Sequence, residues 1–274
     1  MLRPFPSFFS IAAILAGPLS LLFIGCHQER IADQSHSSSV KITVAAASDL
    51  TLALKEVGDS IRQHEWIDVV FSFGSSGLLT QQIEAGAPFD AFVSASESYI
   101  ERLKQAGLVL EGSDSVFAQG RLVLWQRSDA IVRLESPQQL ALASIKRFAI
   151  ANPEHAPYGR AAREVLNEIG IWNAVNDKVV YAENVAQAFQ FAKSGNVDVA
   201  IIARSLIAAQ EGRTVPIDPN LHSPINQTIC ILKRTQSVTT AQRFVSYLRS
   251  PEGNGILKRY GFRLPTESVD VESQ

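Results

Sequence analysis

Four short segments place small or polar residues between the end of an apolar run and the start of an amphipathic one. They are Ala47-Ser48-Asp49, Gly74-Ser75-Ser76-Gly77, Ala156-Pro157-Tyr158-Gly159 and Glu183-Asn184-Val185. The first turn of a helix leaves main-chain N–H groups without partners, and the helix dipole adds about half a positive charge there. Four converging helix starts would therefore offer hydrogen-bond donors and roughly two positive charges to a small dianion.

Each segment also has a structural interpretation that the sequence leaves open. Ser48 and Ser76 are alternatively simple N-caps, which is the commonest role of serine in front of a helix. Gly74 and Gly77 alternatively serve only to let the backbone turn. Whether the four segments meet depends on the fold.

A hydrolase built on Ser76 is the alternative from a different class of function. A nucleophile elbow with the pattern G-x-S-x-G needs glycine where Leu78 stands. His155 is a candidate base for Ser76, but no acidic residue completes a triad, and a loop histidine usually makes a structural hydrogen bond. Metal-ligand spacings and a dinucleotide glycine fingerprint do not occur in the sequence. We therefore expect a binding protein without a cofactor or a cation site, and not an enzyme.

The apolar pattern after residue 40 predicts the elements that carry these segments. We expect strands at 40–46, 67–73, 89–93, 121–125, 148–151, 178–182, 197–203 and 227–232. We expect helices at 49–64, 76–85, 159–169, 185–193, 242–249 and 254–259, and a further one that ends at Gln105. Alternating strands and helices, with strands that are apolar throughout, predict an α/β protein with mostly parallel sheets covered on both faces. Two such units in succession fit two lobes.

The first 26 residues are typical of an export signal. Arg3 precedes an apolar stretch that ends at Gly25-Cys26 and is short for a transmembrane helix. The segment Phe23-Ile24-Gly25-Cys26 resembles a lipobox, in which the cysteine is acylated, although Phe23 replaces the commoner leucine. We expect 1–26 to be a signal peptide of lipoprotein type with Cys26 as the lipid anchor, and 27–39 to be a polar tether. Ordinary export without a lipid is the alternative.

Composition argues against other partners. The 274 residues carry a net charge of −2, and Lys and Arg are scattered, which argues against nucleic acid. Cys230 has only Cys26 as a possible partner, so we expect no structural disulfide and a small buried apolar role for Cys230.

A series of segments between Lys41 and Leu264 carries a family resemblance. Its members are Thr43-Val44-Ala45-Ala46-Ala47-Ser48-Asp49-Leu50, Phe73-Gly74-Ser75-Ser76-Gly77, Gln82-Ile83-Glu84-Ala85-Gly86-Ala87-Pro88-Phe89-Asp90, Asn152-Pro153-Glu154-His155-Ala156-Pro157-Tyr158-Gly159, Ala182-Glu183-Asn184-Val185 and Lys258-Arg259-Tyr260-Gly261-Phe262. In this order they resemble the molybdate-binding proteins of ABC-type importers. The resemblance implies a type II periplasmic-binding-protein fold, in which crossing strands join two α/β lobes around the anion. On this basis 40–122 plus 227–267 form lobe 1, 123–226 form lobe 2, and 268–274 are a tail.

The resemblance also implies the ligand contacts. They fall on Ser48 and Ser76 through hydroxyl and main-chain N–H, and on Tyr158 and Val185 through main-chain N–H. Some relatives add a tyrosine hydroxyl where Ala203 stands here, so either the Tyr158 hydroxyl or the Asp49 N–H replaces it. We expect the Asp49 carboxylate to point away from the dianion and to favour the helix start, because like charges repel.

The implied function is extracytoplasmic capture of molybdate or tungstate for the membrane permease of an ABC importer. We expect a monomer that is periplasmic, or lipid-anchored outside the cytoplasmic membrane or in the outer membrane. Both anions are tetrahedral dianions whose oxygens only accept hydrogen bonds, whereas phosphate carries a proton that needs an acceptor. Sulfate, thiosulfate or a phosphonate is the alternative ligand, and an exported serine hydrolase is the remote alternative. The sequence does not separate molybdate from tungstate, which are nearly the same size.

Overall fold

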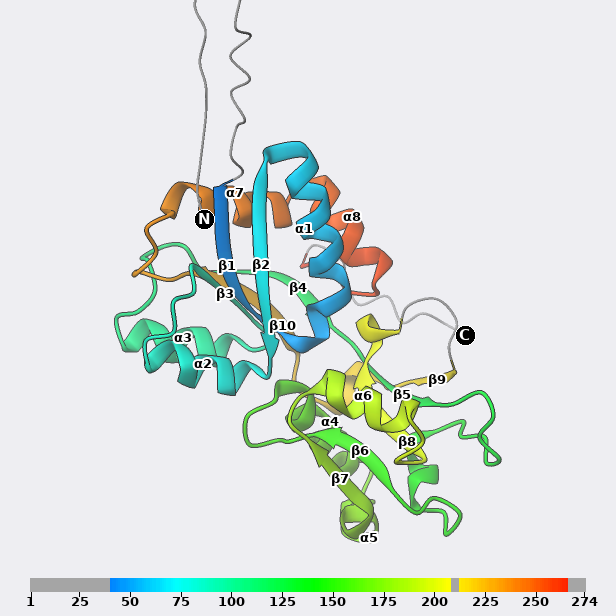
Figure 1. Ribbon diagram of the computed structural model, residues 1–274. Helices are drawn as coiled ribbons and strands as arrows, with labels where there is room; N and C mark the ends of the chain where they lie inside the picture. The colour runs from blue at the N-terminus through cyan, green and yellow to red at the C-terminus, as the bar shows by residue number, and fades with distance from the viewer. Residues whose placement is uncertain (1–39, 208–211, 266–274) are drawn as a thin grey trace, which may run out of the picture. The chain divides into compact units, whose positions relative to one another are not determined.

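Two five-stranded sheets form the framework of the computed structural model, which describes residues 40–207 and 212–265 (Figure 1). All of these residues belong to one compact unit. The expected signal peptide, Cys26, the tether and the tail lie outside the described residues. Those expectations therefore stay predictions.

The first sheet has the strand order β2-β1-β3-β10-β4. β1 pairs in parallel with β2 and β3, whereas β10 runs antiparallel to β3 and β4. β10 is thus the single reversed strand of this sheet. The strands are β1 (Val40–Ala47), β2 (Ile67–Gly74), β3 (Ala91–Ser94), β4 (Ser115–Gly120) and β10 (Ile225–Ile231).

The second sheet repeats this plan with the order β7-β6-β8-β5-β9. β6 is parallel to β7 and β8, and β5 is antiparallel to β8 and β9. The strands are β5 (Leu122–Gln126), β6 (Phe148–Ala151), β7 (Val179–Ala182), β8 (Val199–Ala203) and β9 (Arg213–Pro216). The expected two-lobed α/β fold with mostly parallel sheets is confirmed, and each sheet is mixed because it contains one reversed strand.

The reversed strand of each sheet is the one that the chain enters from the other sheet. After β4 the chain passes through Arg121 directly into β5, and after β9 it returns to the first sheet as β10. These two crossings join the lobes. The strands of the first sheet end at Gly120 and resume at Ile225, near the lobe boundaries predicted at 122 and 227.

The apolar pattern missed part of the first crossing. It predicts one strand at 121–125, but the extended segment starts at Ser115 and is divided between two sheets. Gln119 and Gly120 interrupt the apolar run, so the pattern does not identify the first half as a strand. The short strand β9 and the one-turn helix α5 (Trp172–Val175) also lack a clear periodic signal.

Helices flank both sheets, and most begin and end near the predicted positions. The main helices are α1 (Thr51–Glu65), α2 (Ser76–Glu84), α3 (Glu97–Gln105), α4 (Pro157–Glu168), α5 (Trp172–Val175), α6 (Val185–Lys193), α7 (Val238–Leu248) and α8 (Pro251–Arg259). Short 3₁₀ turns include η1 (Ser48–Leu50), directly before α1, and η4 (Arg204–Leu206), directly after β8.

Both faces of the first sheet are buried, as strands that are apolar throughout require. On β1, Val44 and Ala46 pack into the main core with residues of α1, α7 and α8, whereas Ala45 packs with α2 and α3. On β3, Val93 and Phe92 divide in the same way. This alternation follows from the two-residue period of a strand.

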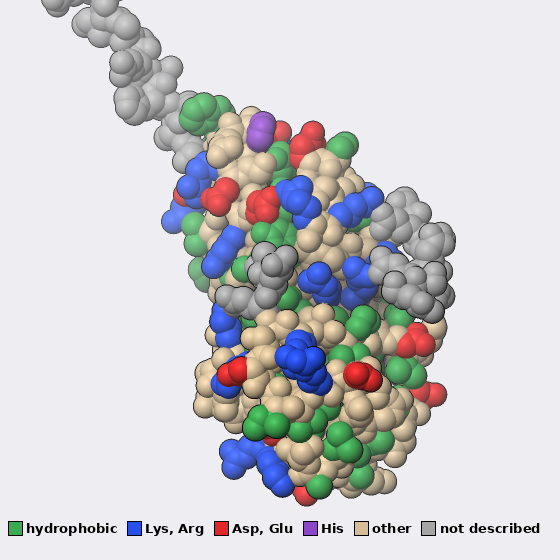
Figure 2. All heavy atoms as spheres, turned by 90° about the vertical axis from the view of Figure 1, so that its right-hand side faces the viewer, with side chains coloured by type: hydrophobic (Ala, Val, Ile, Leu, Met, Phe, Trp, Pro, Cys, Tyr) green, Lys and Arg blue, Asp and Glu red, His purple; other side chains and the backbone are tan. Residues whose placement is uncertain are grey.

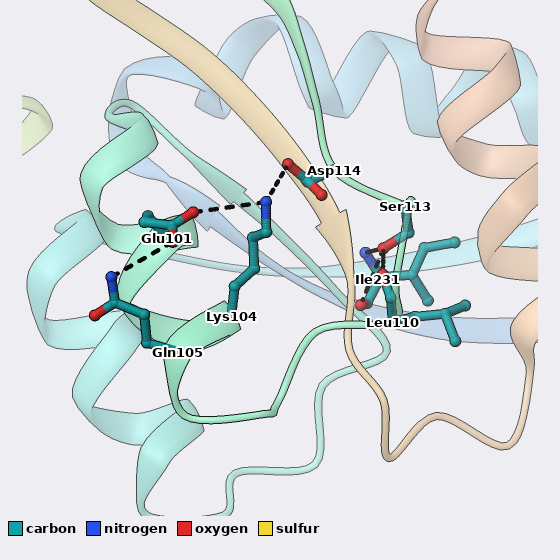
Figure 3. Close-up of polar contacts among 7 residues, drawn as sticks. All are labelled: Glu101, Lys104, Gln105, Leu110, Ser113, Asp114 and Ile231. Atoms are coloured by element: carbon teal, nitrogen blue, oxygen red, sulfur yellow. Dashed lines mark hydrogen bonds and ion pairs between the residues drawn. The ribbon is translucent and has the colours of Figure 1, made fainter.

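The segment before β4 is hydrogen-bonded to the end of β10 (Figure 3). Ser113 Oγ accepts a hydrogen bond of 3.1 Å from the Ile231 N–H. Lys104 Nζ lies 3.2 Å from Asp114 Oδ2 and 3.5 Å from Glu101 Oε2. Because these ion pairs face solvent, they contribute little to stability, and the Ser113 contact is the one that positions β4.

Charged side chains occur on the surface as dispersed groups and exposed pairs. Basic and acidic groups are interspersed with uncharged surface on the face in Figure 2. Arg62 and Asp68 form one such exposed pair at 2.8 Å. Within residues 40–207 and 212–265, the helices are too short or too polar to cross a membrane.

Phe148 tests the packing of the second sheet. It is fully buried in β6, between β7 and β8. We expect Phe148→Ala to lower the free energy of unfolding by about 3–5 kcal/mol, because the surrounding core relaxes only partly into the cavity. Ile131, which is 100% exposed, provides the control, and Ile131→Ala should change stability by less than about 0.5 kcal/mol. Urea unfolding measures both variants, and equal effects would contradict this account of the core.

Candidate functional site

The four segments singled out in the sequence surround one small pocket. It encloses about 190 Å³ of atom-free space, its mouth included, and both lobes contribute to its wall. Its lining residues are Ala47, Ser48, Asp49, Gly74, Ser75, Ser76, Ala95, Ala156, Pro157, Tyr158, Asn184 and Val185. The structure thus brings together Ser48, Asp49, Ser76, Tyr158 and Val185, which stand far apart in the chain.

Ser76 is the first residue of α2 and is buried in the pocket wall. Its Oγ accepts a hydrogen bond of 3.0 Å from the Ala95 N–H. A hydroxyl that accepts a bond keeps its own proton, so Ser76 can donate into the pocket. The helix is capped instead by Ser75, whose Oγ accepts from the Leu78 N–H at 3.4 Å. The N-cap interpretation of Ser76 is therefore wrong.

Ser48 begins the turn η1 and is also buried. The N-cap of this turn is Ala47, and no side chain caps it. The main-chain carbonyl of Ser48 accepts a bond of 2.7 Å from Thr51 Oγ1. The N-cap interpretation is wrong here too, and the Ser48 hydroxyl is left at the pocket wall.

The second lobe contributes the starts of α4 and α6. Pro157 is the first residue of α4 and has no N–H, so the N–H of Tyr158 is the first donor of that helix. Val185 is the first residue of α6, and its N-cap Asn184 accepts a bond of 3.0 Å from the Gln187 N–H. The Asn184 side chain thus satisfies a later donor and leaves the Val185 N–H to the pocket.

The Asp49 side chain is buried, and its carboxylate is directed at the crossing strand β10. Its Oδ2 accepts a hydrogen bond of 2.9 Å from Gln227 Nε2, and Gln227 lies outside the pocket lining. Burial raises the pKa of Asp49 to about 7, against the lowering effects of the nearby Tyr158 hydroxyl, its own main-chain N–H and the Gln227 amide. The side chain thus has a partner in Gln227 that the sequence pattern does not indicate.

The Tyr158 hydroxyl packs against Gly120 at the end of β4. A Cβ at Gly120 would lie 1.9 Å from this hydroxyl oxygen and 3.2 Å from Gln227 Nε2, so only glycine fits there. Burial and the neighbouring Asp49 raise the pKa of Tyr158 well above its ordinary value, and the phenol stays protonated. Because Gly120 and Gln227 lie outside the pocket lining, the geometry favours the main-chain N–H of Tyr158 as the donor to the pocket.

His155 bridges the two lobes beside the pocket. Its Nδ1 lies 2.8 Å from Ser75 Oγ, and its carbonyl accepts bonds from the Gly77 N–H at 2.9 Å and from Tyr99 Oη at 3.1 Å. His155 is therefore bonded to Ser75 and not to Ser76. The proposed base for a hydrolase has a structural role.

A second bridge lies after β8. Ala203 ends this strand without a side-chain donor, but Ser205 Oγ donates a bond of 2.7 Å to the main-chain carbonyl of Asp49. The turn that follows Ala203 is thus hydrogen-bonded to the main chain of Asp49, which is part of the pocket wall.

Gln227 and Ser205 support the site and were not indicated by the sequence pattern, whereas Ser75 stood in one of the four segments but without a role of its own. Gln227 carries little signal in the sequence, because it lies between Asn226 and Thr228 at the start of the strand expected at 227–232, and only the fold shows that it is buried and bonded to Asp49. Ser75 and Ser205 stand in polar turns, where nothing distinguishes them from their neighbours.

Within the described part of the chain, no cluster of three or more His, Cys, Asp or Glu side chains is placed to hold a metal ion. Cys230 is a buried free thiol, and burial raises its pKa to about 12. It is therefore unreactive and behaves as the small apolar side chain that its sequence context predicts.

Comparison with known proteins agrees with this architecture. Residues 42–263 match the family described as bacterial extracellular solute-binding protein. The molybdate-binding protein ModA of Rhodobacter capsulatus is 33% identical over 223 residues, which cover 81% of this chain and 88% of the relative. YvgL of Bacillus subtilis (strain 168), whose name contains the words ABC transporter substrate-binding lipoprotein, is 29% identical over 92% of this chain and 96% of its own length.

A solved structure shares both the sequence and the fold. The periplasmic molybdate-binding protein of Azotobacter vinelandii matches with a TM-score of 0.77 and 33% sequence identity, covering 82% of this chain and 99% of that one. Sequence identity and fold agree over the same large part of the chain. The chain therefore belongs to the bacterial extracellular solute-binding proteins, in the group represented by the ModA molybdate-binding proteins.

Proposed function

We propose that this chain captures molybdate or tungstate outside the cytoplasm and delivers it to the membrane permease of an ABC importer. It binds and releases its ligand unchanged, acts as a monomer, and is not an enzyme. The observation that carries the proposal is the convergence of four helix starts and two serine hydroxyls on one pocket.

The proposed ligand shell consists of donors only. Ser48 and Ser76 contribute hydroxyl and main-chain N–H groups, and Asp49, Tyr158 and Val185 contribute main-chain N–H groups. Such a shell suits an anion whose oxygens carry no proton, because every contact is then a donor facing an acceptor. It disfavours phosphate, whose proton would face another donor.

The charge of the ligand is balanced by helix dipoles and not by a cation. None of the pocket-lining residues is Lys or Arg. Arg160, the basic residue next to a lining segment, is engaged with Tyr99: Nη1 donates to the phenol oxygen at 2.9 Å, and the guanidinium carbon lies 5.2 Å from the ring centre. The engagement of Arg160 elsewhere disfavours a phosphonate. Sulfate has the same charge as molybdate and tungstate, and cavity size separates it from them because its bonds are shorter.

Ligand capture requires the lobes to come together, because each lobe supplies only part of the donor shell. The His155 and Ser205 bridges stabilise the closed arrangement beside the pocket. Lobe separation breaks these contacts and opens the shell, which gives the ligand a route to the permease.

Ser76 tests the donor shell. We expect Ser76→Ala to weaken molybdate binding about ten- to a hundredfold, because a hydrogen bond to a charged group contributes about 1.5–3 kcal/mol. Ser98 lies exposed on α3, 2.9 Å from Ser96 Oγ, and Ser98→Ala should leave the affinity unchanged. Titration calorimetry of both variants with molybdate, tungstate, sulfate and phosphate provides the measurement. Tight binding of sulfate without molybdate would refute the proposed ligand.

The variant Gly77→Ala tests whether ligand binding requires the two lobes to close. A Cβ there would lie 2.7 Å from both the His155 carbonyl oxygen and the Tyr99 hydroxyl, so Gly77→Ala forces the lobes apart. We expect a loss of affinity of tenfold or more. Gly255 in α8 meets nothing closer than 3.8 Å, so Gly255→Ala should leave binding intact and raise helix stability by about 0.5–1 kcal/mol. Equal affinities of the two variants would argue against this role of the His155 bridge.

We also propose export through residues 1–26 and a lipid anchor on Cys26, outside the cytoplasmic membrane or in the outer membrane. The supporting observations are the apolar stretch that ends at Gly25-Cys26 and the word lipoprotein in the name of the relative YvgL.

The anchor is tested by mass spectrometry of the mature protein. We expect a chain that begins at a diacylated Cys26 and sediments with membranes. Cys26→Ser should release the protein into the soluble fraction, whereas Cys230→Ala should leave the anchor unchanged. A mature N-terminus without acyl groups would rule out the lipid.

A further inference from the structure

A buried polar cluster behind the pocket is incompletely hydrogen-bonded. Asp49, Tyr158 and Gln227 come from η1, α4 and β10, and their side chains are buried. Gln227 Nε2 donates to Asp49 Oδ2 at 2.9 Å. Three other buried atoms of the cluster make no hydrogen bond of good geometry, namely Asp49 Oδ1, Gln227 Oε1 and Tyr158 Oη, although the Tyr158 hydroxyl lies close enough to Asp49 to lower the pKa of its carboxyl group.

The count of donors shows what the cluster lacks. When Asp49 is ionised, Asp49 Oδ1 and Gln227 Oε1 can only accept, and the single proton of Tyr158 serves one of them. One buried acceptor then stays without a donor, which costs free energy. A proton on Asp49 supplies a second donor. The Asp49 carboxyl proton and the Tyr158 hydroxyl then provide two donors for the two acceptor sites.

We propose that Asp49 takes up one proton from solvent as the dianion enters the pocket and returns it when the anion leaves. The proposal rests on the proposed function, because it concerns the same pocket. Asp49 lines that pocket, so a bound dianion disfavours a further negative charge beside it. Gln227 and Tyr158 are positioning residues, which hold the neutral carboxyl group away from the ligand.

Burial and the bound ligand determine whether the Asp49 carboxyl group carries a proton. Tyr158 is the titratable group that faces it from α4, and β10 contributes the neutral Gln227. The first turn of α1, residues 51–54, carries no charge. On the remaining neighbouring elements, Ser205 is bonded to the Asp49 carbonyl, and Val185 and Ala188 are apolar. The two nearby arginines are bonded elsewhere: Arg204 to the Ile207 carbonyl and Arg121 to the Gly261 carbonyl.

The pH dependence follows with a definite sign. The pKa of Asp49 in the free protein is about 7, and the dianion raises it further. Well below pH 7 the group is already neutral, and affinity does not change with pH. Above pH 7 binding must bring in a proton, so affinity falls with rising pH, with a slope that approaches tenfold per pH unit and a total loss of roughly fiftyfold between pH 7 and pH 9.

Proton uptake is measured directly by titrating the whole protein with molybdate at pH 8 in three buffers of different ionisation enthalpy. We expect a net uptake that approaches one proton per anion bound. In Asp49→Asn the uptake should vanish, and affinity should change by less than about threefold between pH 6.5 and pH 9. Asp59→Asn makes the same charge change at an exposed position of α1 and should behave as the unmodified protein.

The variant Gln227→Leu tests whether Gln227 positions the Asp49 carboxyl group or only supports the fold. Gln227→Leu removes both the Nε2 donor and the Oε1 acceptor that face Asp49, so the midpoint of the affinity–pH curve should move. A lower affinity with an unchanged midpoint would assign Gln227 a purely structural role and overturn its part in the proposal. Tight binding without proton uptake and with no dependence on pH would overturn the proposal as a whole and leave the proposed function intact. Absence of any molybdate binding would instead refute the proposed function.

Discussion

Main-chain N–H groups at the starts of four helices are the constraint on which the rest of the structure depends. They have no acceptor within their own helices, and the closed lobes remove them from solvent. In the proposed function, an acceptor-only dianion would satisfy groups from both lobes at once. This arrangement requires the carboxyl ends of β1 and β2 to face those of β6 and β7, because the four segments follow these strands. The two crossings after β4 and β9 make such a juxtaposition possible.

The crossing strands are also part of the site. Gln227 of β10 bonds to Asp49, and Gly120 at the end of β4 leaves room for the Tyr158 hydroxyl. The elements that connect the lobes thus support the pocket wall from behind. Gln227 approaches the Asp49 carboxylate from the first sheet, whereas Tyr158 approaches it from α4 of the second lobe, so lobe movement changes the surroundings of this carboxylate.

Regular elements were predictable where a periodic apolar pattern is uninterrupted. The strand expected at 40–46 is β1 (Val40–Ala47), and the helix expected at 185–193 is α6. The prediction failed at β4, because Gln119 and Gly120 break the pattern for reasons that lie elsewhere in the fold. Gly120 accommodates Tyr158, and the Gln119 side chain donates a hydrogen bond of 3.2 Å from Nε2 to Asn226 Oδ1 on β10. Contacts between residues this far apart leave no periodic trace.

The sequence by itself determined the α/β class and the positions of four donor-rich helix starts, because periodicity and helix-start chemistry are local properties. Tertiary structure decided that the four starts share one pocket, since convergence depends on sheet order and on the two crossings. It also decided that Ser75, and not Ser76, caps α2, that His155 bridges the lobes, and that the Asp49 carboxylate meets Gln227. Each of these outcomes depends on which distant group lies within hydrogen-bond distance, and that information exists only once the chain is folded.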